Sequence, residues 1–188
     1  MTFITHFRES WNKVRENNEA WKAHLMQWRR ENAVIRLERP TRLDRARALG
    51  YRAKEGIIVT RVRVLCGGHT RPDRSGGGST KHMRKRLALR KGYRQIAEER
   101  VAKQYSNCEV LNSYFLAKDG QHYWFEVILI DSAHPAVLAD HRLCGIAQRR
   151  GRVFRGITAA GRKTRGMRWK GKGSEKTRPS RRAHDRLL

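Results

Sequence analysis

The stretch "HYWFEVILID", residues 122–131, holds the longest apolar run of the chain and ends in an acid. It follows "EVLNSYFLA" (109–117), and "KDGQ" (118–121) joins the two. An Asp-Gly pair between two apolar segments is a strong hairpin signal, so both segments are predicted to be strands of one β-hairpin. Side chains alternate along a strand, so one face would carry Phe125, Val127 and Leu129, and the other Trp124, Ile128 and Ile130. Because both faces are largely apolar, we expect this strand to be covered on both sides and to form the centre of the core.

The segments around the hairpin predict helices and one more strand. Residues 6–31 have aromatic and aliphatic side chains at i, i+4 and i+7, which is typical of a helix packed on a core or a partner. "GIIVTRVRV" (56–64) alternates β-branched residues with arginine, as a strand does. Short helices are predicted after Thr41 or Asp44 up to Gly50, over residues 93–105, and within 133–148 after Pro135. The pattern therefore alternates helices and strands around a modest core.

The charge of the chain indicates a polyanionic partner. Lys and Arg number 43 against 17 Asp and Glu, which gives a formal net charge of +26 over 188 residues. Such an excess is self-repulsive, and a densely charged nucleic acid is the usual partner that neutralises it. No stretch is long enough to span a membrane and no signal peptide is apparent, so we expect a cytoplasmic protein without a membrane partner. The three widely spaced cysteines argue against a disulfide scaffold.

The basic residues are concentrated in three segments that differ in composition from the rest. These are "RPTRLDRARALGYRAKEG" (39–56), a glycine-rich internal loop (66–92), and a C-terminal tail from residue 149 that is rich in arginine and glycine. The loop and the tail have little apolar periodicity, so we expect them to extend along RNA rather than to fold alone. Three regions follow: an N-terminal helical, RNA-contacting region (1–55), an α+β core with the loop (56–148), and an extended tail (149–188).

Several blocks resemble a known family. "ERPTRLDRARALGYRAKEG", "AEERVAKQYSNCEVLNSY", "WFEVILID" and "RVFRGITAAGRKTRG…GKGSEKTRPS" occur in the order found in the large-subunit ribosomal protein fifteen of archaea and eukaryotes, the L-fifteen-e family. The resemblance covers nearly the whole chain, and "GKGSEKTRPS" is similar to the archaeal type. It implies an α+β fold, with a small mixed β-sheet, packed helices, a long basic internal loop and an extended basic C-terminal tail.

The resemblance also implies a structural, non-enzymatic constituent of the large ribosomal subunit. Its partners would be the large-subunit rRNA and neighbouring ribosomal proteins, with no small-molecule substrate. No cofactor is expected beyond magnesium ions associated with the rRNA. The residues predicted to contact rRNA are Arg39, Arg42, Arg45, Arg47, Arg52, Lys54, Arg61, Arg63, Arg71, Arg74, Lys81, Arg84, Lys85, Arg86, Arg90, Lys91, Arg149, Arg150, Arg152, Arg155, Arg162, Lys163, Arg165, Arg168, Trp169, Lys170, Lys172, Lys176 and Arg178.

Catalysis is a second interpretation of the core strand. Glu126, Asp131 and His134 could belong to a nuclease site. The two acids are five residues apart, so in a regular strand they point to opposite faces and cannot act as a pair. A metal-dependent nuclease would also need further converging acids, so the sequence favours a structural role.

Four residues of zinc-ligand types raise the possibility of a metal site. Cys66 and His69 form one short-spaced pair, and His141 and Cys144 form another. The two pairs lie far apart in the sequence, so a shared zinc ion would require the fold to bring them together.

The charge is equally compatible with a free-standing RNA-binding protein or RNA chaperone. Such a protein would need the same excess of Lys and Arg to neutralise phosphates. Retention on the large subunit through a high-salt wash would separate it from a ribosomal protein.

Overall fold

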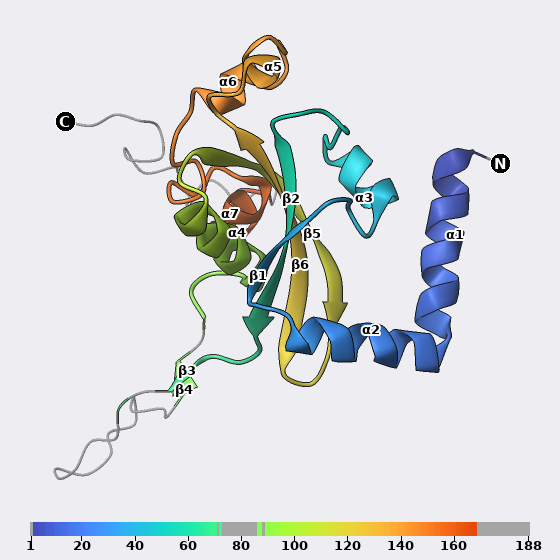
Figure 1. The fold of residues 1–188 in the computed structure, drawn as a ribbon. Helices are drawn as coiled ribbons and strands as arrows, with labels where there is room; N and C mark the ends of the chain where they lie inside the picture. Colours follow the sequence, from blue (N-terminus) through green and yellow to red (C-terminus); the bar gives the residue numbers. More distant parts are fainter. Residues whose placement is uncertain (1, 71, 73–85, 88, 169–188) are drawn as a thin grey trace, which may run out of the picture.

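The fold is an α+β structure built on one antiparallel sheet, as a computed structural model shows (Figure 1). The structure describes residues 2–168 apart from residues 71, 73–85 and 88. The sheet has four strands in the order β1-β2-β6-β5, where β1 is Val34–Leu37, β2 is Ile57–Leu65, β5 is Cys108–Lys118 and β6 is His122–Asp131. The predicted α+β class and the central hairpin are confirmed, whereas β1 was not predicted.

All three strand pairs are antiparallel, so the expected mixture of pairing directions is wrong. The reason lies in α4 (Tyr93–Gln104), which carries the chain back from the end of β2 to the start of β5. That return makes β2 and β5 run in the same direction. The hairpin then places β6 between them, antiparallel to both. The two parallel strands therefore never pair.

β6 is buried on both faces, as predicted. Phe125, Val127 and Leu129 pack with α4, in one cluster with Ala97 and Val101. Trp124 and Ile128 pack on the opposite face, beneath the N-terminal helices. Ile130 extends into a third cluster at the end of the sheet with α5 (Pro135–Leu138) and α6 (Cys144–Ala147), the two short helices found where one was expected within 133–148. The strand thus joins all parts of the core.

The N-terminal helical region consists of two helices rather than one. α1 is Phe3–Glu16 and α2 is Asn18–Arg30, and the chain turns sharply between them (Figure 1). Asn17 leaves the helical conformation, and its Oδ1 accepts hydrogen bonds from the N–H groups of Glu19 (3.1 Å) and Ala20 (3.2 Å). Asparagine is a favoured N-cap, so the sequence starts a second helix here. Trp28 is buried beside Trp124 of the sheet, and Trp11 is buried in the same cluster, which confirms packing for this part of the aromatic stripe.

Two short segments accompany these elements. α3 (Leu43–Ala48) lies on the same side of the sheet as α1 and α2, where Ala46 is buried. In the predicted loop, β3 (His69–Thr70) pairs with β4 (Arg86–Leu87), and the intervening part lies mainly outside the described residues.

Part of the C-terminal segment that was expected to be extended is folded. Residues 149–168 are folded onto the core and include α7 (Ala159–Thr164). Val153 is 1% exposed and joins the α4 cluster, and Ala160 is 4% exposed. A small number of apolar side chains, helped by hydrogen bonds to the core, is therefore enough to fold a segment whose composition suggested an extended tail. The prediction for 169–188 lies outside the described residues.

Candidate nucleic-acid interface

Arginine side chains cover the free edge of β5. Arg94 of α4 donates from Nε to Ser113 Oγ (2.7 Å), and from Nη2 to Asn112 Oδ1 (2.7 Å) and to the Ser113 carbonyl. Arg152 donates to the Val110 carbonyl at 2.8 Å. Carbonyl groups at a sheet edge would otherwise invite pairing with another chain. The arginines therefore both protect the edge and bring positive charge to it.

Further arginines surround these two. Burial lowers the pKa of Arg94; Glu98 opposes this shift, and the charges of Arg168 and Arg45 add to it. Burial likewise lowers the pKa of Arg152, with Glu109 opposing and Arg149 adding. Arg162 also lowers the pKa of Arg152. These arginines come from α3, α4, α7 and the segments flanking α7. The name β5-edge surface is used for the whole group: Arg45, Arg94, Arg149, Arg152, Arg162 and Arg168.

Glu98 holds the C-terminal segment on this surface. Its side chain on α4 is fully buried and accepts hydrogen bonds from the hydroxyls of Ser113 and Thr158 (2.6 Å for Thr158). Thr158 is the N-cap of α7, and its Oγ1 accepts from the Gly161 N–H at 3.2 Å. Burial raises the pKa of Glu98. The hydrogen bonds from Ser113 and Thr158 oppose this shift, as do the positive charges of Arg94 and Arg152. One carboxyl group therefore connects α4, β5 and α7.

Glu126 has the same kind of role on the other side of the sheet. It is fully buried, and its oxygens accept from the Thr41 N–H (3.2 and 3.3 Å) and from the Tyr114 hydroxyl. Burial raises the pKa of Glu126, while the bonds from Thr41 and Tyr114 oppose the shift. Glu126 thus fixes the segment that leads into α3. A carboxyl with these partners and no exposure is structural, which argues against the nuclease hypothesis.

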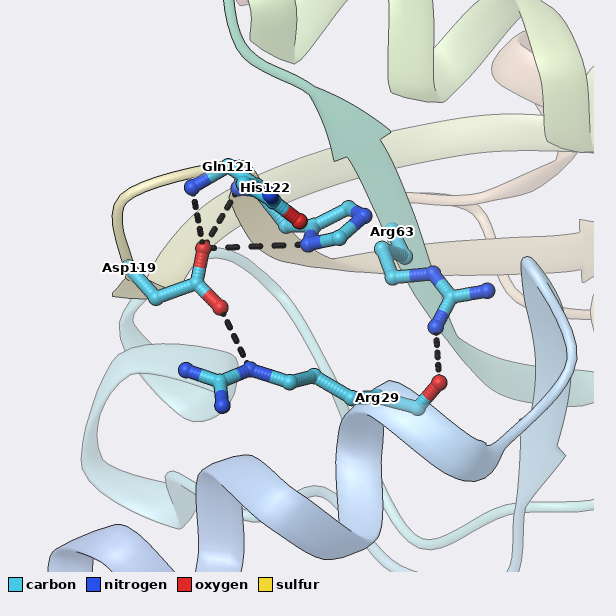
Figure 2. A network of polar contacts seen from close by, with 5 residues as sticks. All are labelled: Arg29, Arg63, Asp119, Gln121 and His122. Atoms are coloured by element: carbon cyan, nitrogen blue, oxygen red, sulfur yellow. Dashed lines mark hydrogen bonds and ion pairs between the residues drawn. The ribbon is translucent and has the colours of Figure 1, made fainter.

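Asp119 is a third acid whose carboxylate makes contacts within the fold (Figure 2). Its Oδ1 accepts from the N–H groups of Gln121 (2.8 Å) and His122 (2.5 Å), which closes the hairpin turn. Its Oδ2 accepts from Arg29 Nε at 2.7 Å, and these bonds lower the pKa of Asp119 against the effect of its burial. Arg63 of β2 donates to the Arg29 carbonyl at the end of α2. This network joins α2 to the sheet.

The predicted RNA-contacting residues fall into three groups. Exposed side chains without a hydrogen bond or ion pair to another described residue are Arg39, Arg45, Arg47, Arg90, Arg149, Arg150, Arg162, Lys163 and Arg168. Residues with internal partners are Arg42, Arg52, Lys54, Arg61, Arg63, Lys91, Arg152, Arg155 and Arg165. Outside the described residues lie Arg71, Arg74, Lys81, Arg84, Lys85, Trp169, Lys170, Lys172, Lys176 and Arg178, while the structure gives only the backbone of Arg86.

Several residues of the second group form ion pairs within the fold. Arg61 is 8% exposed and makes a bidentate ion pair with Glu31, from Nε at 3.0 Å and from Nη2 at 2.7 Å. Arg42 pairs with Asp44 at 3.0 Å, and Lys54 with Asp140 at 3.5 Å. These ion pairs hold Arg61, Arg42 and Lys54 against other parts of the fold.

Arg94 is a residue of the β5-edge surface that the sequence pattern did not reveal. It sits in the helix 93–105, where the apolar periodicity marks only the residues that face the core. Its spacing from Glu98, four positions later, was the available signal, because opposite charges at i and i+4 lie on one helix face.

The positions of the four candidate zinc ligands do not support a shared metal site. Cys66 lies beside the hairpin turn, where its N–H donates to the Gln121 carbonyl, and His69 is in β3. Cys144 begins α6 at the opposite end of the sheet (Figure 1), and His141 precedes it. Within the described part of the chain, no group of three or more His, Cys, Asp or Glu residues could hold a metal ion. None of the described helices has the length and hydropathy of a membrane span.

The comparisons with known proteins support the resemblance seen in the sequence. The family described as Ribosomal L15 matches residues 2–184. A protein of the archaeon Methanocella arvoryzae named "Large ribosomal subunit protein eL15" is 46% identical over 187 residues, which is 97% of this chain and 95% of that protein. The family is a structural, non-enzymatic class. The chain therefore belongs to the ribosomal L15 family and is a structural constituent of the cytoplasmic ribosome.

Proposed function

We propose that the chain binds large-subunit rRNA and stabilises it during assembly of the large subunit and during translation. The name of the archaeal relative supports the large subunit as the location. The proposed partners are the rRNA and neighbouring ribosomal proteins. Magnesium ions would be held with the rRNA, and no resident cofactor is proposed.

The observation that carries the proposal is that buried acids make contacts within the fold, while several arginines are exposed at the surface. The acids Glu98, Glu126 and Asp119 point inward and hold basic segments on the sheet. The arginines of the β5-edge surface remain charged, and Arg45, Arg149, Arg162 and Arg168 are exposed. A surface that gathers like charges and pairs them with few acids is unfavourable until a polyanion covers it.

Binding would proceed through phosphate contacts. Each phosphate neutralised by an arginine releases condensed counterions, which makes the affinity high at low salt and steeply salt-dependent. Guanidinium groups can also bind two phosphate oxygens at once, or stack on exposed bases. Because many weak contacts share the binding, loss of a single arginine should have only a small effect.

The test measures rRNA affinity as a function of salt for the full chain. In one variant Arg45, Arg149 and Arg162 are replaced by Gln; in a matched control, Lys13, Lys22 and Arg30 of α1 and α2, also exposed, are replaced by Gln. If the three arginines contact phosphates, the slope of log affinity against log salt should become shallower by about 2 to 3, at roughly 0.9 per contact on duplex nucleic acid. The control should change it less.

Two results would contradict the proposal. Equal losses in the two variants would mean that net charge alone drives binding, without a specific surface. An unchanged slope in the first variant would mean that the β5-edge surface does not contact RNA. Circular dichroism of each variant checks that the fold is retained.

A further inference from the structure

One aromatic side chain on the sheet is left uncovered beside the β5-edge surface. Phe115 of β5 is 45% exposed, although it lies on the sheet face that α4 covers elsewhere. It pairs in register with Phe125, which is buried in the α4 cluster. Phe115 therefore marks the place where the apolar face emerges from under α4.

The rings beneath Phe115 form a fixed support. Tyr93 stacks on Tyr123 with centroids 4.5 Å apart and planes inclined by 20°. Phe115 meets Tyr123 at 6.3 Å and Phe125 at 6.0 Å, both in edge-to-face arrangements. Such pairs restrain a ring without covering it. Phe115 is thus held in place while much of its surface stays open.

Positive charges flank the open ring. Lys118 pairs with Tyr123 in the strand register, and its Nζ lies 5.1 Å from the Tyr123 ring centroid. On the other side, Arg94 binds the carbonyl of Ser113, two residues before Phe115. The nearby acids are already engaged, since Glu98 accepts from Ser113 and Asp119 from Arg29. A restrained aromatic ring beside an exposed cation matches the pattern that binds single-stranded nucleic acid, where bases stack and phosphates pair with cations.

We propose that Phe115 stacks an unpaired base of bound RNA, with Lys118 placed to meet an adjoining phosphate. The inference deepens the proposed rRNA binding and rests on it. The exposed cation favours this occupant over an apolar protein surface, because such a partner would cover Lys118, which has no ion pair with an acid among the described residues. Stacking on an aromatic ring tolerates any base, so the site selects an unpaired nucleotide rather than a sequence.

The experiment compares two single-stranded probes of equal length with the full chain. One is an oligouridylate, and the other has the same ribose-phosphate backbone without bases. The wild-type chain should bind the first more tightly. Phe115→Ala should weaken binding of the oligouridylate by about 5- to 100-fold, the usual range for one base-stacking contact. Binding of the abasic probe should stay unchanged.

Two further variants separate stacking from structural damage. Phe115→Tyr keeps a ring and should restore the preference for the base-bearing probe. Phe7→Ala removes a phenylalanine of similar exposure (39%) on α1 and should leave the preference intact. Thermal unfolding of each variant confirms that the comparison is made between folded chains.

The outcomes distinguish the inference from the function on which it rests. Equal affinity of the wild type for both probes would overturn the stacking role. An undiminished preference for the base-bearing probe in Phe115→Ala would overturn it as well. Either result would point to a protein surface or another part of this chain as the cover for Phe115. If the wild type bound neither probe nor the rRNA, the proposed rRNA binding would itself be refuted, and the stacking role with it.

Discussion

Glu98 and Glu126 are buried on opposite sides of the sheet, and each holds a chain segment on the core through different hydrogen-bond partners. Glu98, on a helix, accepts from the hydroxyls of Ser113 and Thr158 and has Arg94 and Arg152 nearby. Glu126, on the central strand, accepts from the backbone N–H of Thr41 and the hydroxyl of Tyr114. Each fixes a basic segment, 149–168 or 39–48, on a small core. The comparison shows that the few acids act as anchors, which leaves arginines free to face outward.

The most damaging change to either anchor is its removal. Glu98→Ala or Glu126→Ala would leave buried donors unpaired and a cavity behind, and should lower the free energy of unfolding by about 3 to 5 kcal/mol. Urea unfolding measures the loss. Hydrogen exchange should rise chiefly in 149–168 for Glu98→Ala and in 39–48 for Glu126→Ala.

The exposed acid Glu55 supplies the control. Its side chain is 90% exposed, so Glu55→Ala should change the unfolding free energy by less than about 0.5 kcal/mol. Exchange that rises equally over the whole chain in both alanine variants would show that the two acids do not anchor separate segments.

Thr158 links the first anchor to α7, so its hydroxyl has a double role. Thr158→Val removes one hydrogen bond to Glu98 and the N-cap of α7, and should cost about 2 to 3 kcal/mol. Thr158→Ser keeps the hydroxyl and should cost much less. Limited proteolysis should cut 149–168 faster in the valine variant only; equal cleavage of the two would argue against the anchor.

Gly161 tests the packing on the same side of the sheet. A Cβ built on Gly161 would lie 2.6 Å from the Gly156 Cα, and the neighbouring backbone has little freedom to move. Gly161→Ala should therefore destabilise the chain by about 1 to 3 kcal/mol. Gly145→Ala meets no atom within 4 Å and is the matched control. Equal thermal unfolding temperatures for the two variants would contradict this close approach.

The smallest expected effect is a pH dependence shared by both anchors. Burial raises the pKa of Glu98 and Glu126. Above the unfolded pKa of about 4.3, the folded chain therefore binds more protons than the unfolded chain. The free energy of unfolding consequently falls as the pH rises toward the folded pKa. Glu98→Gln or Glu126→Gln removes this dependence. Relative to wild type, each should gain stability as pH increases from about 4 to 7. A constant difference in urea unfolding over that range would contradict the raised pKa.

The core could be predicted from the sequence because its signals are local. Alternating apolar residues in β6 and the Asp119-Gly120 turn specify the hairpin directly. The anchors could not be predicted, because the contact of Glu98 with Thr158 joins residues 60 positions apart and depends on the packing of α4. For the same reason the sequence did not predict the fold of 149–168 or the ion pair of Arg61 with Glu31, which lies 30 positions away.

Retention of the chain on large ribosomal subunits through a high-salt wash tests the central claim most directly. Subunits from cells that express the tagged wild type, the variant with Arg45, Arg149 and Arg162 changed to Gln, or the α1–α2 control would be washed and sedimented, and the bound chain quantified. We predict that the wild type and the control stay bound, while the β5-edge variant is largely lost although it folds. Loss of the wild type at moderate salt would instead indicate a free-standing RNA-binding protein or chaperone, and full retention of the β5-edge variant would contradict the role given to its arginines.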